Sequence, residues 1–182
     1  SWAGRYVAWV AIASAGFEVA YISWQAAWGR TSHFNVATAF DATMYTMMGV
    51  GAVLLTSTAL VLGVMVLRGR LPALSRAMHQ AVGWGLVMTF VLGTGYGAYL
   101  SAQTGHAVGG NGFDAGGMAL TGWSRSGGDL RVAHFFGIHA VHVMVLFSWL
   151  SDWWSRHCVA GGEVDAGRAR SAVTAVWALG AA

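Results

Sequence analysis

Three histidines lie close together in an otherwise apolar stretch of the sequence, at His134, His139 and His142. An imidazole ring is costly to place among apolar side chains, so each ring is expected to have a partner that holds it there. Neutral imidazole is a common metal ligand, and a hydrogen bond to a neighbouring helix is the alternative. The three histidines are therefore the first candidates for binding a metal or a metal-centred cofactor.

The spacing of the histidines selects two of them as the expected metal ligands. At 100° per residue, His139 and His142 are about 60° apart around a helix, and His134 and His142 about 80°. His134 and His139 differ by about 140°, so these two lie at opposite edges of the shared face. We predict His139 and His142 as metal ligands, with His134 as a further contact to the cofactor.

A b-type haem is the favoured cofactor, with His139 or His142 as one axial ligand. Methionines of the second predicted span lie at a matching depth and would complete a His/Met pair, which raises the potential of a haem. The magnesium of a bacteriochlorophyll needs only one histidine, and copper accepts both imidazole and thioether ligands. Bacteriochlorophyll and copper are therefore alternatives to haem. The expected methionine contacts are Met44, Met47 and Met48.

Two acidic residues, Glu18 and Asp41, lie inside predicted spans. A carboxylate at such a depth either pairs with a cation or is itself protonated. We expect a polar group in the outer half of the molecule that either relays protons to and from the histidines or joins the spans by hydrogen bonds. Its expected members are Glu18, Asp41, His33, His106 and Arg131.

The composition indicates which elements carry these groups. The chain is 56% hydrophobic and 9% charged, with a mean hydropathy of +0.55, whereas a soluble domain carries about 25% charged residues. Crossing the hydrocarbon core of a membrane takes about 20 apolar residues. Four stretches are long enough, and a fifth, partial one either lies at the interface or belongs to a longer chain. They cover residues 6–28, 37–67, 78–102, 132–154 and 171–182.

These stretches predict an all-α fold, a polytopic transmembrane helix bundle that forms one domain over residues 1–182. Pro72 is the only proline, so the spans are expected to be largely unkinked. Either Asn35 or Thr38 is expected to cap the second span, and Asp129 the fourth. Each helix start is thus supported by a polar side chain at its boundary.

Glycines mark two further features of the chain. Gly93 and Gly97 are four residues apart in the third span, a spacing that lets another helix pack closely against it. Residues 105–128 are rich in glycine and connect the third span to the fourth. We expect this connection to be a loop on the outer side of the molecule.

Several chemistries are excluded by residues that the chain lacks. It contains no lysine, which excludes a retinal or pyridoxal Schiff base. Its single cysteine, Cys158, excludes internal disulfides and Cys-ligated iron–sulfur clusters. The commonest hydrolase motifs are absent. No catalytic residue is assigned, and the sequence does not decide whether the chain is an enzyme.

The arginines predict the orientation in the membrane. Seven lie at span ends on the side of the N-terminus and three on the opposite side, so the positive-inside rule places the N-terminus in the cytoplasm. Their places at span ends also explain the isoelectric point near 9.5 without nucleic-acid binding. We expect a bacterial inner-membrane protein with its histidine-rich side facing the periplasm, in contact with lipid and with other membrane subunits.

Two parts of the sequence resemble uncharacterised bacterial multi-span inner-membrane proteins. They are HFN at 33–35 with FDA at 40–42, and GGDLRVAHFFGIHA at 127–140. The resemblance implies a multi-span topology and brings no established activity. From the histidines and their setting, we expect a haem-binding subunit of bacterial membrane electron transfer. The alternatives are an accessory or pigment-binding subunit of a respiratory or photosynthetic complex, and a copper or proton transporter.

Overall fold

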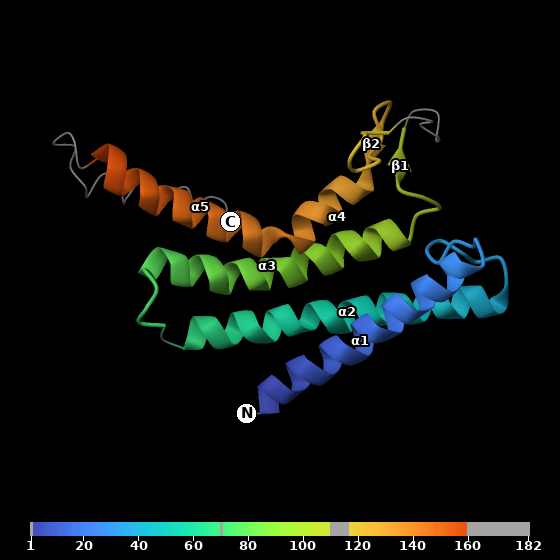
Figure 1. Cartoon of the computed structure of the whole chain (residues 1–182), viewed down its shortest axis with the longest axis horizontal. Helices are drawn as coiled ribbons and strands as arrows, with labels where there is room; N and C mark the ends of the chain where they lie inside the picture. Colours follow the sequence, from blue (N-terminus) through green and yellow to red (C-terminus); the bar gives the residue numbers. More distant parts are fainter. Residues whose placement is uncertain (1, 70, 110–116, 160–182) are drawn as a thin grey trace.

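The structure is a computed structural model that describes residues 2–69, 71–109 and 117–159 (Figure 1). It is mostly helical, which confirms the predicted all-α class apart from one antiparallel pair of two-residue strands. The partial span predicted at 171–182 lies outside the described residues. The elements are α1 (Trp2–Ala27), α2 (Ala39–Arg68), α3 (Arg76–Ser101), β1 (Ala107–Val108), β2 (Gly128–Asp129), α4 (Leu130–Ile138), α5 (Ala140–Trp154) and a π-helical turn, Ser155–Val159.

Three of the described helices, α1, α2 and α3, are long and apolar enough to cross a membrane. They contain 26, 30 and 26 residues, which is about 39 to 45 Å of helix against a hydrocarbon core of about 30 Å. α4 and α5 meet the same requirement only as a pair. The described chain therefore has the helices of a membrane protein, with three spans, or four if α4 and α5 count as one broken span.

Two of the helices, α2 and α4, begin at residues that the sequence predicts as caps. Thr38 Oγ1 accepts a hydrogen bond from Asp41 N–H at the start of α2, and the Asp129 carboxylate accepts one from Arg131 N–H at the start of α4. Ser75 plays the same part at the start of α3. Each cap gives a partner to a backbone N–H that has none within its own helix.

The predicted fourth span, 132–154, is broken at His139, where α4 and α5 meet at an angle of 62°. The expectation of unkinked spans is wrong here, because a break needs no proline. His139 has φ −101° and ψ 13°, outside the helical range. Val141 N–H donates to Thr89 Oγ1 of α3 at 3.2 Å. Insertion of a side chain into the hydrogen-bond ladder of a helix is an established cause of a kink.

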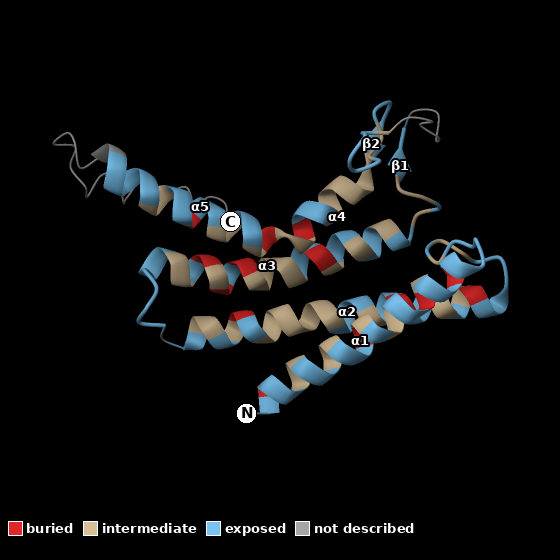
Figure 2. Ribbon diagram, viewed as in Figure 1, coloured by how far each residue is buried: buried red, intermediate tan, exposed pale blue. Residues whose placement is uncertain are grey.

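Glycines bring α3 into close contact with both halves of the broken span. A Cβ atom on Gly85 would lie 2.8 Å from the Cα of Val141, and one on Gly93 would lie 2.9 Å from Cγ2 of Ile138. On Gly97 it would lie 3.0 Å from a side chain of α4. The predicted role of Gly93 and Gly97 in close helix packing is therefore confirmed. Figure 2 shows buried residues where α4 and α5 meet above α3.

The helices form an open row rather than a closed bundle. α1 packs on α2, α2 on α3, and α3 on both α4 and α5 (Figure 1). Within the described residues, α1 has no extensive contact with α4 or α5. Few side chains are buried as a result, and large apolar residues are exposed along every helix (Figure 2). In a membrane these faces contact lipid or other proteins.

The packing of α5 on α3 predicts opposite effects for two glycines of the same helix. Gly85→Ala should lower the free energy of unfolding by about 1–3 kcal/mol, because the new methyl group meets the backbone of Val141. Gly95→Ala is the control: nothing lies within 4 Å of its Cβ position, so it should stabilise the helix by up to about 1 kcal/mol. Thermal unfolding in detergent, followed by circular dichroism, measures both. Equal effects of the two substitutions would contradict the packing described.

Candidate functional site

The break in the fourth span carries two histidines whose rings lie side by side. His139 ends α4 and precedes α5, and His142 lies in the first turn of α5. The two Nδ1 atoms are 3.4 Å apart, and the ring centroids are 5.1 Å apart. His139 is half-buried and His142 exposed. The structure therefore brings together the two residues that the sequence predicts as metal ligands.

Aromatic and apolar groups surround the pair. The Phe135 ring lies 4.4 Å from the His139 ring, centroid to centroid, and Trp123 of the outer loop lies 5.5 Å from Phe135. On the other side, His142 lines a shallow groove of about 380 Å³ between α3 and α5. The other residues of the groove are Met78, Val141, Val145, Leu146 and Trp149. Apart from the imidazole, the side chains of this groove have no ionisable group.

The separation of the two nitrogens admits two readings. An N–H···N hydrogen bond of 3.4 Å is long, since such bonds are usually about 2.9–3.0 Å. Two nitrogens bound to one tetrahedral metal ion at 2.0–2.1 Å are about 3.3–3.4 Å apart. The observed distance fits the edge of a tetrahedral site better than it fits a good hydrogen bond. The distance is thus compatible with a long hydrogen bond and with two ligands of one metal ion.

The third histidine of the cluster faces elsewhere. The His134 ring packs against α3 at Gly97, and within the described residues its Nδ1 has no hydrogen-bond partner. This separation follows from the wide angle between positions 134 and 139 on a helix. Across residues 2–69, 71–109 and 117–159, no group of three His, Cys, Asp or Glu side chains converges on one point. The histidine pair thus supplies two ligands from this part of the chain.

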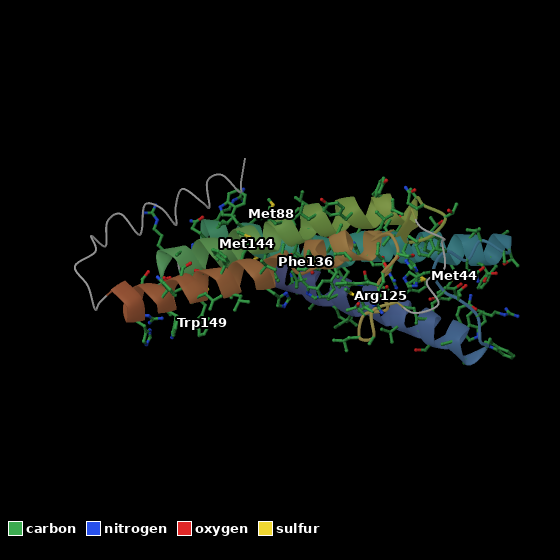
Figure 3. The ribbon with its side chains drawn as sticks, turned by 90° about the horizontal axis from the view of Figure 1, so that it is seen from above. Met44, Met88, Arg125, Phe136, Met144 and Trp149 are labelled. Carbon is green, nitrogen blue, oxygen red and sulfur yellow. The ribbon has the colours of Figure 1, made fainter. Side chains whose placement is uncertain are left out.

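The predicted methionine ligands lie at a different level of the molecule. Thr56 of α2 hydrogen-bonds to Thr94 of α3 at 3.1 Å, and the neighbouring Gly93 packs against α4 at its last residue. His139 is therefore level with about residue 56 of α2. At about 1.5 Å per residue, Met48 lies roughly 12 Å and Met44 roughly 18 Å along α2 from this level. Figure 3 likewise shows Met44 near one end of the molecule, away from Met144 on α5. The described chain does not assemble the predicted His/Met pair from Met44, Met47 or Met48.

Asp41 belongs to a second polar group, which joins α1 to α2. Gln25 Nε2 donates to Tyr21 Oη at 2.6 Å and to Asp41 Oδ1 at 3.1 Å. Thr38 Oγ1 donates to Asp41 Oδ2 at 2.6 Å. All but Thr38 are buried, with Gln25 1% exposed and Asp41 7% exposed. The buried carboxylate is therefore held by neutral donors rather than by a cation.

Gln25 was not predicted from the sequence, although a signal for it exists. Ser14, Glu18, Tyr21 and Gln25 recur every three or four residues, which places them on one face of α1. Ser14 packs near Gly51, so this face is turned toward α2. Glu18 is half-buried on the same face, without a hydrogen bond or ion pair to any described residue. A repeated polar position on an apolar helix marks the side that meets another helix.

Asp129 is the centre of a third polar group, in the loop between α3 and α4. Its carboxylate accepts hydrogen bonds from the Arg131 guanidinium at 2.6 Å and from Ser124 N–H at 2.9 Å. Arg131 also donates to Gly122 O at 2.7 Å. His106 Nδ1 lies 3.5 Å from the carboxylate, beside the paired strands β1 and β2. These contacts tie the two ends of the loop to the start of α4.

The predicted outer polar group is therefore divided among separate places in the structure. Arg131 and His106 belong to Asp129 rather than to Asp41 or Glu18. His33 bonds to its neighbour Ser32 in the turn before α2. Among the described residues, no hydrogen bond or ion pair links any of them to the histidine pair. A direct proton relay from the carboxylates to that pair is not assembled here.

Comparison with known proteins adds no assignment. The sequence matches no family model, and no curated protein or solved structure shows significant similarity to it. The function is therefore argued from the geometry of the sites alone.

Gln25 should be essential for the contact between α1 and α2. Gln25→Leu removes one donor from the buried Asp41 carboxylate and the partner of the Tyr21 hydroxyl, which should cost about 1–3 kcal/mol of unfolding free energy. Gln103→Leu is the matched control, because among the described residues the Gln103 side chain bonds only to the backbone near the end of α3, at Tyr99 O. Thermal unfolding in detergent compares the two. The role given to Gln25 is wrong if both variants unfold at the same temperature.

Asp129 should keep the outer loop folded in moderately acidic solution. Hydrogen bonds from Arg131 hold the pKa of the Asp129 carboxyl well below its ordinary value of 3.8, although burial acts to raise it. Because the pKa of Asp129 is lower in the folded than in the unfolded chain, its charged carboxylate stabilises the fold at every pH above the unfolded-state pKa. This contribution is lost as the pH falls through the folded-state pKa. The loop should therefore remain protected at about pH 4 and open in stronger acid.

Hydrogen exchange of residues 117–131, measured by mass spectrometry across this pH range, tests the loop. Arg131→Gln should raise the pKa of Asp129 and move the opening toward higher pH. Arg30→Gln, a change in the other outer turn, is the control and should leave the profile unchanged. An identical profile for wild type and Arg131→Gln would refute the assigned ion pair.

Proposed function

We propose that this protein is an integral membrane subunit that binds a transition-metal ion through His139 and His142. The observation that carries the proposal is the 3.4 Å separation of the two Nδ1 atoms at the break between α4 and α5. Neutral imidazole nitrogen is a ligand that zinc and copper both accept. Ionisable groups in membrane helices are rare and mark functional sites by default.

The break supports the proposal because it is a costly feature. A broken helix at membrane depth leaves backbone groups without partners, and such breaks occur where they are buried in protein or serve a site. Here Thr89 satisfies the N–H of Val141. His139, at the break, and His142 both lie within one turn of this contact. The support for the break and the two proposed ligands are thus at the same place along α3.

The geometry favours a small ion over a haem. The two axial ligands of one haem iron lie on opposite faces of the macrocycle, so two adjacent rings on one helix supply at most one of them. The methionines considered as second ligands lie on a remote part of α2. A chelated ion uses both imidazoles at once. We therefore place metal binding or transfer within the membrane ahead of haem-based electron transfer.

Metal binding by the purified protein in detergent tests this function. Wild type should bind Zn²⁺ or Cu⁺, and His139→Ala and His142→Ala should each weaken binding by more than the roughly 10–100-fold that follows loss of a second-shell partner. His79→Ala on α3 is the control and should bind normally. Equilibrium dialysis with elemental analysis gives the amount bound.

The visible spectrum of the same samples distinguishes the other cofactors. A Soret band that is lost in His142→Ala would show that the histidines bind haem rather than a single metal ion. Red or near-infrared absorption would indicate a bound pigment. Full metal binding by the His139→Ala/His142→Ala double variant would refute the assignment.

A further inference from the structure

The histidine pair offers two ligands, and its remaining coordination positions are open. Structural zinc sites almost always have four protein ligands in a tetrahedral arrangement. His142 is exposed, so the pair is accessible from outside the chain. We infer that two copies of this chain share one metal ion, each contributing His139 and His142. This inference rests on the proposed metal site and adds the partner that completes it.

The rest of the described chain does not complete the site. No third His, Cys, Asp or Glu in that part of the molecule converges with the pair. Asp129 is engaged by Arg131, and Asp41 is held by Gln25 at the far side of the row. The missing ligands must therefore come from outside residues 2–69, 71–109 and 117–159. A second copy supplies two imidazoles with the same spacing, whereas an unrelated chain would need a matching pair of its own.

α5 carries an exposed face on which a second copy fits. His142, Leu146, Trp149 and Trp153 recur at intervals of four, three and four residues, which is the spacing of a helix–helix seam. The three apolar members are 55%, 50% and 41% exposed. The seam thus extends from the histidines along one side of α5. Helices that pack along it would bring their His142 residues close together.

Symmetry brings the two metal half-sites to the same depth. Two copies inserted in the same direction are related by a two-fold axis along the membrane normal, which pairs each surface with itself. Equivalent residues are then at equal depth, so the His139–His142 pairs of both copies face each other. Each copy contributes two nitrogens that are 3.4 Å apart, and two such pairs give the four ligands of a tetrahedral site. The number of ligands and the symmetry lead to the same partner.

The mass and metal content of the detergent-purified full chain test the inference, with Zn²⁺ as the probe. With Zn²⁺, light scattering should show a dimer that holds one ion per two chains, and a chelator should return it to a monomer. The His139→Ala/His142→Ala variant should remain monomeric with or without Zn²⁺, while His79→Ala should behave as wild type. One ion per monomer would overturn sharing but leave the proposed function intact. No bound ion at all would overturn both.

Crosslinking in membranes gives a test that does not depend on the histidine variants. Leu146, one turn from His142 on the seam and 55% exposed, is changed to cysteine in a Cys158→Ser background. A short thiol crosslinker should join two copies at this position when Zn²⁺ is present and not after chelation. Leu54→Cys on α2, which is 44% exposed, is the control and should not crosslink. Crosslinking at Leu146→Cys that does not depend on Zn²⁺, or that fails in its presence, would overturn the shared site.

Discussion

The close approach of α3 to the broken fourth span is the constraint on which the rest of the structure depends. Within lipid, helices gain little from the hydrophobic effect by associating, so their contact relies on tight packing and on hydrogen bonds. Gly85 and Gly93 provide the tight packing, since neither position has room for a methyl group. Thr89, between them, accepts the N–H of Val141. Three positions on one helix thus hold the break in place.

The position of the histidines follows from this contact. On a straight helix, residues 139 and 142 would be separated by about 60° around the axis. Residues three apart are neighbours even on a straight helix. Here His139 has left the helical conformation, and its ring lies beside the ring of His142 and against Phe135. The backbone break, the Phe135 ring and the contact between the two Nδ1 atoms together orient the pair. The exposed ring of His142 leaves the pair accessible to a ligand from outside.

The long helices were predictable from the sequence, and the break was not. Uninterrupted apolar runs and capping residues placed α1, α2 and α3 to within a few residues, and Thr38 and Asp129 act as the expected caps. The break depends on Thr89, which lies 52 positions before Val141 and has nothing in its own sequence surroundings to mark it. Without a proline, such a kink arises only once two helices are packed together.

The partners of the polar residues were also not predictable from the sequence. Their types and approximate depths were predictable, but their partners depend on the order of helices in the row. Because α1 and α4 lie at opposite sides of that row, Asp41 is paired with Gln25 and Arg131 with Asp129. In the most apolar parts of α1 and α2, only 11% of the residues are buried. Most residues of these helices are therefore covered by what surrounds the protein rather than by its other helices. The proposed metal half-site on α5 would give one of those surroundings a specific identity, because metal coordination is directional and lipid contact is not.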